Sequence, residues 1–276
     1  MFRLTLGLAF TAAMMASAAT SAAAGVEGAR ALIPHRAIYD LKLKDVSERS
    51  GIEGMYGRMV YEFTGSACTG FTTNFRFVTK TDTGEDQRTT DQQTTTFENA
   101  DLKEFRFETK SFTDEQLDKQ VSGEATNVST GVKVELQKPD TRQLDLTPSQ
   151  FPTQHMLEVL ENARKGKRFF EARVFDGSED GDKSMLTSTV VGKKQTPAAD
   201  DTDAGQAGEF SKQPYWPVTI AYFNDSGEGD AVPIYRMSFK LYDNGITRDL
   251  TMDYGDFVLT GQLAKLEVLD KAPDCK

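Results

Sequence analysis

Large apolar side chains occur at alternate positions along most of the chain. The pattern is clear in segments 71–77, 105–107, 132–136 and 235–241, where they alternate with Thr, Ser, Asn, Gln or charged residues. A period of two gives each segment one apolar and one polar face, which is typical of strands in an antiparallel sheet. Counting such segments predicts about 12–14 strands, joined mainly as a meander.

One segment has a different period. Residues 151–166, FPTQHMLEVLENARKG, carry apolar side chains at helical spacing between Pro152 and Gly166, which are common start and stop residues. We therefore expect a helix of about three turns. Because so large a sheet curls or splits rather than staying flat, the pattern predicts an all-β fold. We expect a large antiparallel open barrel or β-spiral that one internal α-helix plugs or crosses.

Residues 196–210 lack any apolar period and are rich in Ala, Asp, Gly and Thr. We interpret this stretch as a solvated, mobile acidic loop inside a single β domain that spans residues 25–276. The alternative is a linker between two β lobes. The similar strand pattern on both sides of the stretch favours the loop.

The N-terminal residues resemble an export signal. Arg3 precedes an apolar run that ends in three alanines at positions 22–24. This order predicts a signal peptide over residues 1–24 and an exported mature protein. Two cysteines in an oxidising compartment most often form a disulfide, and this chain has only Cys68 and Cys275. A nucleophile, a metal ligand and a buried apolar thiol are the alternatives for Cys68.

The charge balance narrows the range of partners. The chain has 32 Lys and Arg against 42 Asp and Glu, for a formal net charge of −10 at pH 7. An acidic protein is repelled by nucleic acid and by anionic membrane surfaces. We expect neither as a partner. The apolar run at the N-terminus is too short to span a membrane, so no membrane-spanning segment is expected.

Residues suited to catalysis or metal binding are sparse. The chain has only two histidines, His35 and His155, whereas protein zinc sites draw three or four ligands mostly from His and Cys. The acidic run 176–182 lacks the spacing of a calcium-binding EF-hand loop. Local motifs of hydrolases and nucleotide-binding enzymes are also absent from the sequence. We expect no metal, no cofactor and no enzymatic activity, with a Ser-His-Asp triad around His155 as the remaining enzyme hypothesis.

One predicted strand carries an arginine on its apolar face. A period of two over residues 247–254 places Arg248, Leu250, Met252 and Tyr254 together. Arg248 then either pairs with a buried carboxylate or reaches water at a sheet edge, or it orients the anionic group of an amphiphilic ligand inside an apolar cavity. Trp216, between two prolines, either packs in the core or lines the mouth of such a cavity. The candidate ligand residues are therefore Arg248, Trp216, Tyr254 and Met252.

Several of these motifs, taken in order, resemble one known family. The segments HRAIYDLKL, FPTQHMLEVLENARKG, FDGSEDG, PYWPV and TRDLTMDYGDFVLTG, together with Cys68 and Cys275, are similar to the EipB family of cell-envelope integrity proteins from alphaproteobacteria. The resemblance implies a periplasmic β-spiral with an internal helix, similar in shape to the lipoprotein carriers LolA and LolB. It also implies an internal disulfide between Cys68 and Cys275. It supplies no catalytic residues.

Two functional hypotheses follow. In the first, a non-enzymatic periplasmic protein supports envelope integrity by binding a lipid, an acylated ligand or an extended peptide in its curved apolar sheet. In the second, a structural protein with a packed interior acts through an envelope protein that binds its outer face. The size of the interior distinguishes the two hypotheses.

Overall fold

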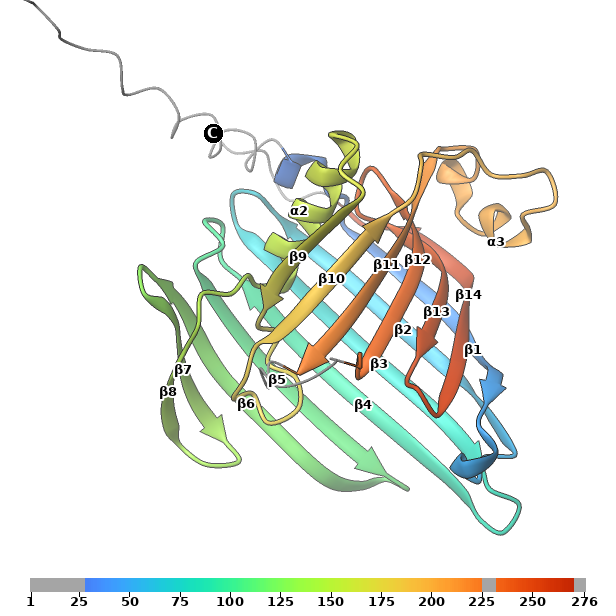
Figure 1. The fold of residues 1–276 in the computed structure, drawn as a ribbon, viewed down its shortest axis with the longest axis horizontal. Coiled ribbons are helices and arrows are strands. Elements are labelled where there is room, and N and C mark those ends of the chain that lie inside the picture. Colours follow the sequence, from blue (N-terminus) through green and yellow to red (C-terminus); the bar gives the residue numbers. More distant parts are fainter. Residues whose placement is uncertain (1–27, 225–231, 271–276) are drawn as a thin grey trace, which may run out of the picture.

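The computed structural model describes residues 28–224 and 232–270 and contains fourteen strands, one long helix and several short helical turns within them (Figure 1). The predicted signal peptide at 1–24 and Cys275 lie outside the described residues. The strands are β1 (His35–Val46), β2 (Gly54–Ser66), β3 (Gly70–Asp82), β4 (Gln87–Glu98), β5 (Glu104–Thr113), β6 (Gln116–Val128), β7 (Gly131–Lys138), β8 (Arg142–Leu146), β9 (Phe169–Val174), β10 (Met185–Val191), β11 (Tyr215–Asn224), β12 (Tyr235–Tyr242), β13 (Thr247–Asp253) and β14 (Phe257–Val268). The helical elements are η1 (Glu48–Ser50), α2 (Pro152–Arg164), α3 (Thr202–Gly205) and η2 (Gly208–Phe210).

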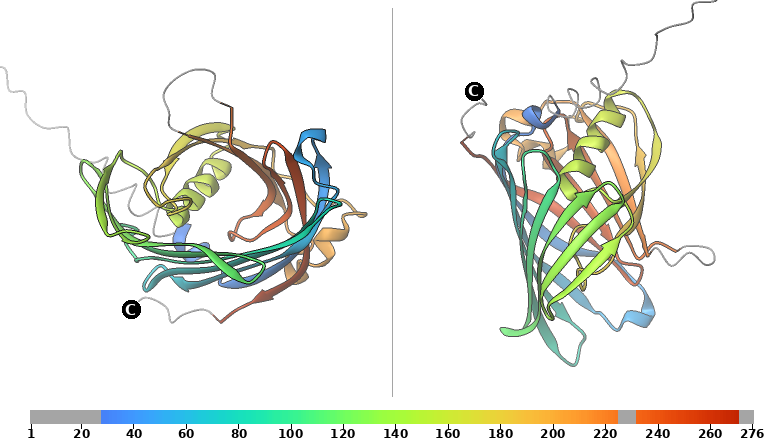
Figure 2. Two further views of the ribbon diagram at one scale, coloured as in Figure 1. Left: turned by 90° about the horizontal axis from the view of Figure 1, so that it is seen from below. Right: turned by 90° about the vertical axis from the view of Figure 1, so that its left-hand side faces the viewer.

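All fourteen strands belong to one antiparallel sheet. Its order runs from β8 back to β1, then from β14 back to β9, so strands from the two ends of the chain pair at the centre of the sheet. The sheet curls around α2 without closing, because β8 and β9 form its two edges (Figure 2). The predicted fold, an open barrel or β-spiral with an internal helix, is confirmed.

The segment between the two edge strands covers part of the gap. Gln150 donates its backbone N–H to the carbonyl of Arg173 at 2.8 Å and accepts from the N–H of Phe175 at 2.9 Å. These bonds satisfy backbone groups at the β9 edge, where an unpaired strand would attract other chains. The chain then enters α2 directly, so the helix starts at the seam of the barrel.

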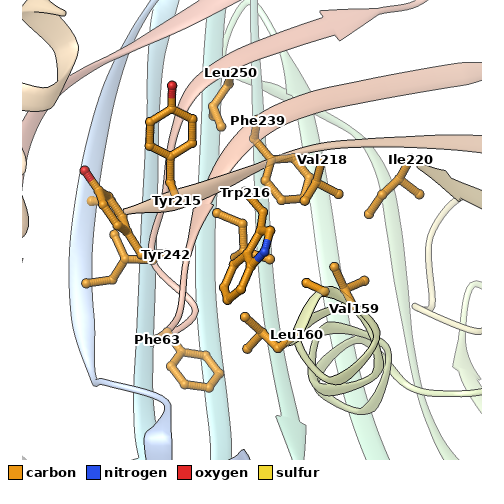
Figure 3. Close-up of a cluster of buried hydrophobic side chains, with 14 of the residues drawn as sticks. Phe63, Val159, Leu160, Tyr215, Trp216, Val218, Ile220, Phe239, Tyr242 and Leu250 are labelled. Atoms are coloured by element: carbon orange, nitrogen blue, oxygen red, sulfur yellow. The ribbon is translucent and has the colours of Figure 1, made fainter. Parts of the chain in front are cut away.

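The alternating pattern explains which side of each strand is buried. In β7, Val132, Val134 and Leu136 are buried while the residues between them are exposed. These strands and α2 form two apolar clusters. The larger one surrounds Leu160 of α2 with residues such as Phe63, Trp216 and Phe239 (Figure 3). The smaller one, around Phe105 and Phe151, holds the start of the helix.

The segment 196–210, predicted as a solvated acidic loop, contains short helical turns and is attached to the sheet at a few residues. It contains α3 and η2 and packs on the outer face of β13 and β14 (Figure 2). Ala204 and Ala207 are buried, and the Asp201 side chain accepts the N–H of Ala204 at 3.0 Å as a helix cap. Most of the segment is exposed, and Ala204, Ala207 and the side chains of Asp201 and Asp203 anchor it to strands that are distant in the sequence.

Candidate functional site

The curled sheet and α2 line a cavity of about 690 Å³ that is partly open to solvent. Pockets that bind small molecules typically occupy about 300–1,000 Å³. The cavity therefore has room for a ligand. Its lining comes from the inward faces of most strands between β1 and β13 and from the first turns of α2.

One side of the cavity is apolar. Strands β2, β11, β12 and β13 supply this side, which we call the apolar wall. Its residues are Met59, Phe63, Ile220, Met237, Phe239 and Leu250. This part agrees with the prediction of a curved apolar sheet, because each of these residues occupies the apolar face of its strand.

The other side is mainly polar and uncharged. Strands β3, β4 and β5 supply it, and we call it the hydroxyl wall. Its polar residues are Thr73, Gln92, Thr94, Thr96, Thr109 and Ser111, and Phe75 of β3 is the one apolar side chain among them. In the sheet order β4 and β5 are separated from β11 and β12 by about half of the fourteen strands, so the part of the apolar wall on β11 and β12 lies across the barrel from the hydroxyl wall (Figure 2). The two walls meet at β2 and β3, where Phe63 lies directly opposite Thr73.

Sequence analysis missed the hydroxyl wall. Strand β4 reads QRTTDQQTTTFE, so polar side chains occupy both of its faces over most of its length and the alternation that marks the inward face is absent. Thr94 lines the cavity, whereas its neighbour Thr95 is exposed and donates to Asn74 Oδ1 at 3.0 Å. The run of β-branched threonines was the signal that was available.

Glu98 ties β4 to the start of α2. Its Oε1 accepts the backbone N–H of Thr153 at 2.6 Å, and only 2% of the residue is exposed. Burial raises the pKa of Glu98 to about 7. Its Oε2 is buried and has no hydrogen-bond partner within the described part of the chain. Sequence reasoning gave no sign of this carboxyl group, because Glu98 ends a polar strand and its partner is 55 residues away.

Both histidines line the cavity and are electrically neutral near pH 7. Burial lowers the pKa of His155 to about 4, and burial also lowers the pKa of His35. His35 Nδ1 lies 2.7 Å from the carbonyl oxygen of Ile33. His155 Nε2 has no hydrogen-bond partner among the residues that the structure describes, so the contacts in the structure give no support for a triad around His155.

Arg248 lies outside the cavity. Its cross-strand partner is Lys240, whereas Thr251 already pairs with Ser238, so the ladder contains a bulge at Asp249. Asp249 has a φ of 53°, in the left-handed region. The extra residue reverses the alternation, so Leu250 faces the cavity and Arg248 faces outward. The prediction that Arg248 shares the face of Leu250 and Met252 is wrong for this reason.

Arg248 is instead held by the α3 segment. Its guanidinium donates to Asp201 Oδ1 at 2.9 Å and to Oδ2 at 3.0 Å, and to the Tyr242 hydroxyl at 2.8 Å. The Tyr215 ring centroid lies 4.9 Å from the guanidinium carbon. Arg248 has 0% exposure. Its bidentate contact with the Asp201 carboxylate offsets the cost of burying the charge. This arrangement matches the alternative of an arginine paired with a buried carboxylate.

The remaining candidate residues are dispersed. Trp216 is buried in the cluster around Leu160, and the ammonium of Lys194 lies 4.1 Å from its ring centroid (Figure 3). Met252 is buried opposite Met237 of the apolar wall. Tyr254 follows β13, is 38% exposed, and its ring centroid lies 4.8 Å from that of Tyr235. Trp216, Met252 and Tyr254 are not among the residues that line the cavity.

Cys68 lies in the turn between β2 and β3. Its backbone N–H donates to Ser66 Oγ at 3.2 Å, and the residue is half-buried. Since Cys275 lies outside the described residues, the pairing of Cys68 with Cys275 stays a prediction.

Residues 28–224 and 232–270 hold no group of three or more His, Cys, Asp or Glu side chains arranged for a metal ion. The acidic run 176–182 uses three of its carboxylates in ion pairs, Asp180 with Lys119, Asp182 with Arg142 and Glu179 with Lys183. In the same part of the chain, no helix is long and apolar enough to cross a membrane.

The fold and the cavity together define a class of protein: a single antiparallel sheet curled into an unclosed barrel, with an internal helix beside a cavity of ligand size. The chain belongs to the EipB-like family, which it matches over residues 26–270. It is 55% identical over 249 residues to the cell envelope integrity protein EipB of Brucella abortus strain 2308, covering 90% of this chain and 88% of that protein. It also matches the crystal structure of a beta-barrel-like protein of unknown function from Brucella abortus. That match has a TM-score of 0.84 and 55% identity and covers 87% of this chain and 99% of the other.

Proposed function

We propose that this protein is a non-enzymatic, exported protein that supports the integrity of the cell envelope by holding an apolar ligand inside its barrel. The observation that carries the proposal is the cavity of about 690 Å³ with its apolar wall. Burial of apolar ligand surface against such a wall contributes roughly 25 cal/mol per Å² of area removed from water. An acyl chain, an acylated peptide or an extended apolar peptide fits this chemistry.

The comparisons support the envelope part of the proposal. The Brucella relative is named for cell envelope integrity, and the N-terminal residues of this chain have the order of an export signal. Both support a periplasmic location. A disulfide between Cys68 and Cys275 suits that oxidising compartment and would tie the end of the chain to the β2–β3 turn.

The competing hypothesis is a structural protein that works through a partner on its outer face. That hypothesis expects a filled interior, because an empty cavity costs stability unless something uses it. The hollow interior therefore favours ligand binding over a purely structural role.

A pair of tryptophan substitutions tests the proposal. Thr94→Trp places a large side chain in the cavity, whereas Thr95→Trp places the same side chain on the outer face of the same strand. We expect the purified parent protein and the Thr95 variant to bind an uncharged fluorescent probe with a fatty acyl chain, and the Thr94 variant to lose at least about tenfold in affinity. Equal affinity in all three proteins, or no binding by the parent, contradicts the proposal.

A further inference from the structure

The two walls of the cavity suit different parts of one ligand. This inference rests on the proposed function and concerns the class of ligand. The apolar wall offers surface for a hydrocarbon chain. The hydroxyl wall offers hydrogen bonds across the barrel from it, so an amphiphile can satisfy both walls at once.

The hydroxyl wall keeps unused hydrogen-bonding capacity. Thr94 and Thr109 lie directly opposite each other on β4 and β5, with their hydroxyl oxygens 3.0 Å apart. A hydroxyl group has one donor and two acceptor positions, so one mutual bond leaves further positions on both side chains. These uncharged groups at the surface of the cavity match the hydroxyl or amide groups of a ligand.

The cavity has little to offer a negatively charged head group. Among its lining residues in the described ranges, Lys119 is the single lysine or arginine, and its ammonium lies 2.8 Å from Asp180 Oδ1. Two carboxylates, Asp176 and Glu179, also line the cavity. Moving a phosphate or carboxylate from water into such a site costs free energy that no cation offsets. Arg248, which is a fully buried cation, faces outward and is already paired with Asp201.

We propose that the cavity binds a neutral amphiphile, with its apolar chain against the apolar wall and an uncharged head that carries hydroxyl or amide groups against the hydroxyl wall. Anionic lipids of the same chain length are discriminated against. Recognition of this kind leaves Glu98 and the histidines without direct charge contacts to the ligand. The specificity then depends on the threonine side chains of β4 and β5.

Two probes with the same chain and different heads test the ligand class. Monododecanoylglycerol is neutral and carries two hydroxyls, whereas dodecyl phosphate is anionic. Each is titrated below its critical micelle concentration into the full mature chain by isothermal titration calorimetry. We expect the neutral probe to bind about tenfold tighter or better, because the phosphate must lose its hydration without a cation to replace it.

Isosteric substitutions identify the wall that is responsible. The double variant Thr94→Val, Thr109→Val removes both hydroxyls and keeps the side-chain shape, and Thr95→Val is the matched outward control. We expect the double variant to weaken the neutral probe about tenfold and to leave dodecyl phosphate unchanged, while the control changes neither. Thr96→Val, on the same wall, is the second variant if the double variant does not fold.

The outcomes separate this inference from the proposed function. If dodecyl phosphate binds as tightly as the neutral probe, or if the valine variants have no effect while Thr94→Trp blocks both probes, the ligand class is wrong and the proposed function stands. If neither probe binds the parent protein, both are wrong.

Discussion

Two deeply buried ionisable residues, Arg248 and Glu98, lie on opposite faces of the curled sheet and differ in how completely they are paired. Arg248 has a carboxylate, a hydroxyl and an aromatic ring around its guanidinium. Glu98 has one backbone N–H at Oε1 and no partner for Oε2 among the described residues. The fully paired group fixes the α3 segment to the outer face. The half-paired group lies between the wall of the cavity and the internal helix, where its charge responds to pH.

The largest expected effect comes from breaking the outer pair. Asp201→Ala leaves the buried Arg248 with no carboxylate closer than Asp203 Oδ2, 3.8 Å from its Nη1. The loss of the closer, two-point contact costs about 3 kcal/mol of unfolding free energy. Lys240, whose ammonium lies 3.0 Å from Asp201 Oδ2, loses the same partner. The measurement is the midpoint of urea unfolding.

Asp200→Ala is the matched control, because Asp200 is exposed next to Asp201. It should change the unfolding free energy by less than about 0.5 kcal/mol. Equal effects of the two substitutions would show that the Arg248 pair does not anchor the α3 segment.

The second largest effect is the contribution of Glu98 to the pH dependence of the unfolding free energy. Since burial raises its pKa from 4.5 to about 7, the folded protein holds a proton that the unfolded chain releases between these pH values. The unfolding free energy should therefore fall as pH rises through this window, by about 3 kcal/mol, and become level above it. Glu98→Gln keeps the shape and should remove this slope.

The pH dependence of the parent protein alone does not isolate Glu98, because His155 also changes protonation on unfolding. The unfolding free energies of the Glu98→Gln variant and the parent must therefore be compared. The pKa of His155 is lowered to about 4, so its contribution to stability rises with pH below about pH 6.5 and opposes that of Glu98. Urea unfolding of both proteins at several pH values isolates the Glu98 contribution. A difference between them that does not change with pH would mean that Glu98 stays ionised in the folded protein.

The smallest expected effect separates stability from binding. Arg248→Met should lower the unfolding free energy, by less than Asp201→Ala, because Lys240 still neutralises Asp201. It should leave the affinity for an acyl probe unchanged within about twofold, since Arg248 faces away from the cavity. A large loss of affinity in a folded Arg248→Met variant would show that Arg248 takes part in ligand binding.

Much of the fold could be predicted from the sequence, because alternation and helix signals are local. The strand with Val132, Val134 and Leu136 and the helix from Pro152 onward have the expected form. The parts that could not be predicted depend on single residues or distant partners. The backbone at Asp249 has one positive φ and a bulge, which reverse the face of Arg248. Arg248 then pairs with Asp201, in a segment whose sequence gives no sign of a buried contact.

The site was predictable only in part, for a related reason. Apolar positions reveal an inward face by their contrast with polar neighbours, so the apolar wall could be expected. In β4 Thr94 and Thr95 are identical in type and point to opposite sides. The curvature of the sheet decides which one meets the cavity. The sequence pattern therefore predicts the barrel and the apolar wall of its cavity, whereas the hydroxyl wall is seen only in the structure.

The most direct test of the central claim is to identify what the protein carries in its native compartment. The full chain is expressed with its own N-terminal residues, isolated gently from the cell envelope fraction and examined by native mass spectrometry, alongside Thr94→Trp and Thr95→Trp. We predict an added mass, released by organic solvent as an amphiphile, on the parent and the Thr95 variant but not on the Thr94 variant. A parent protein that carries no added mass and takes up no amphiphile when one is supplied would contradict the account.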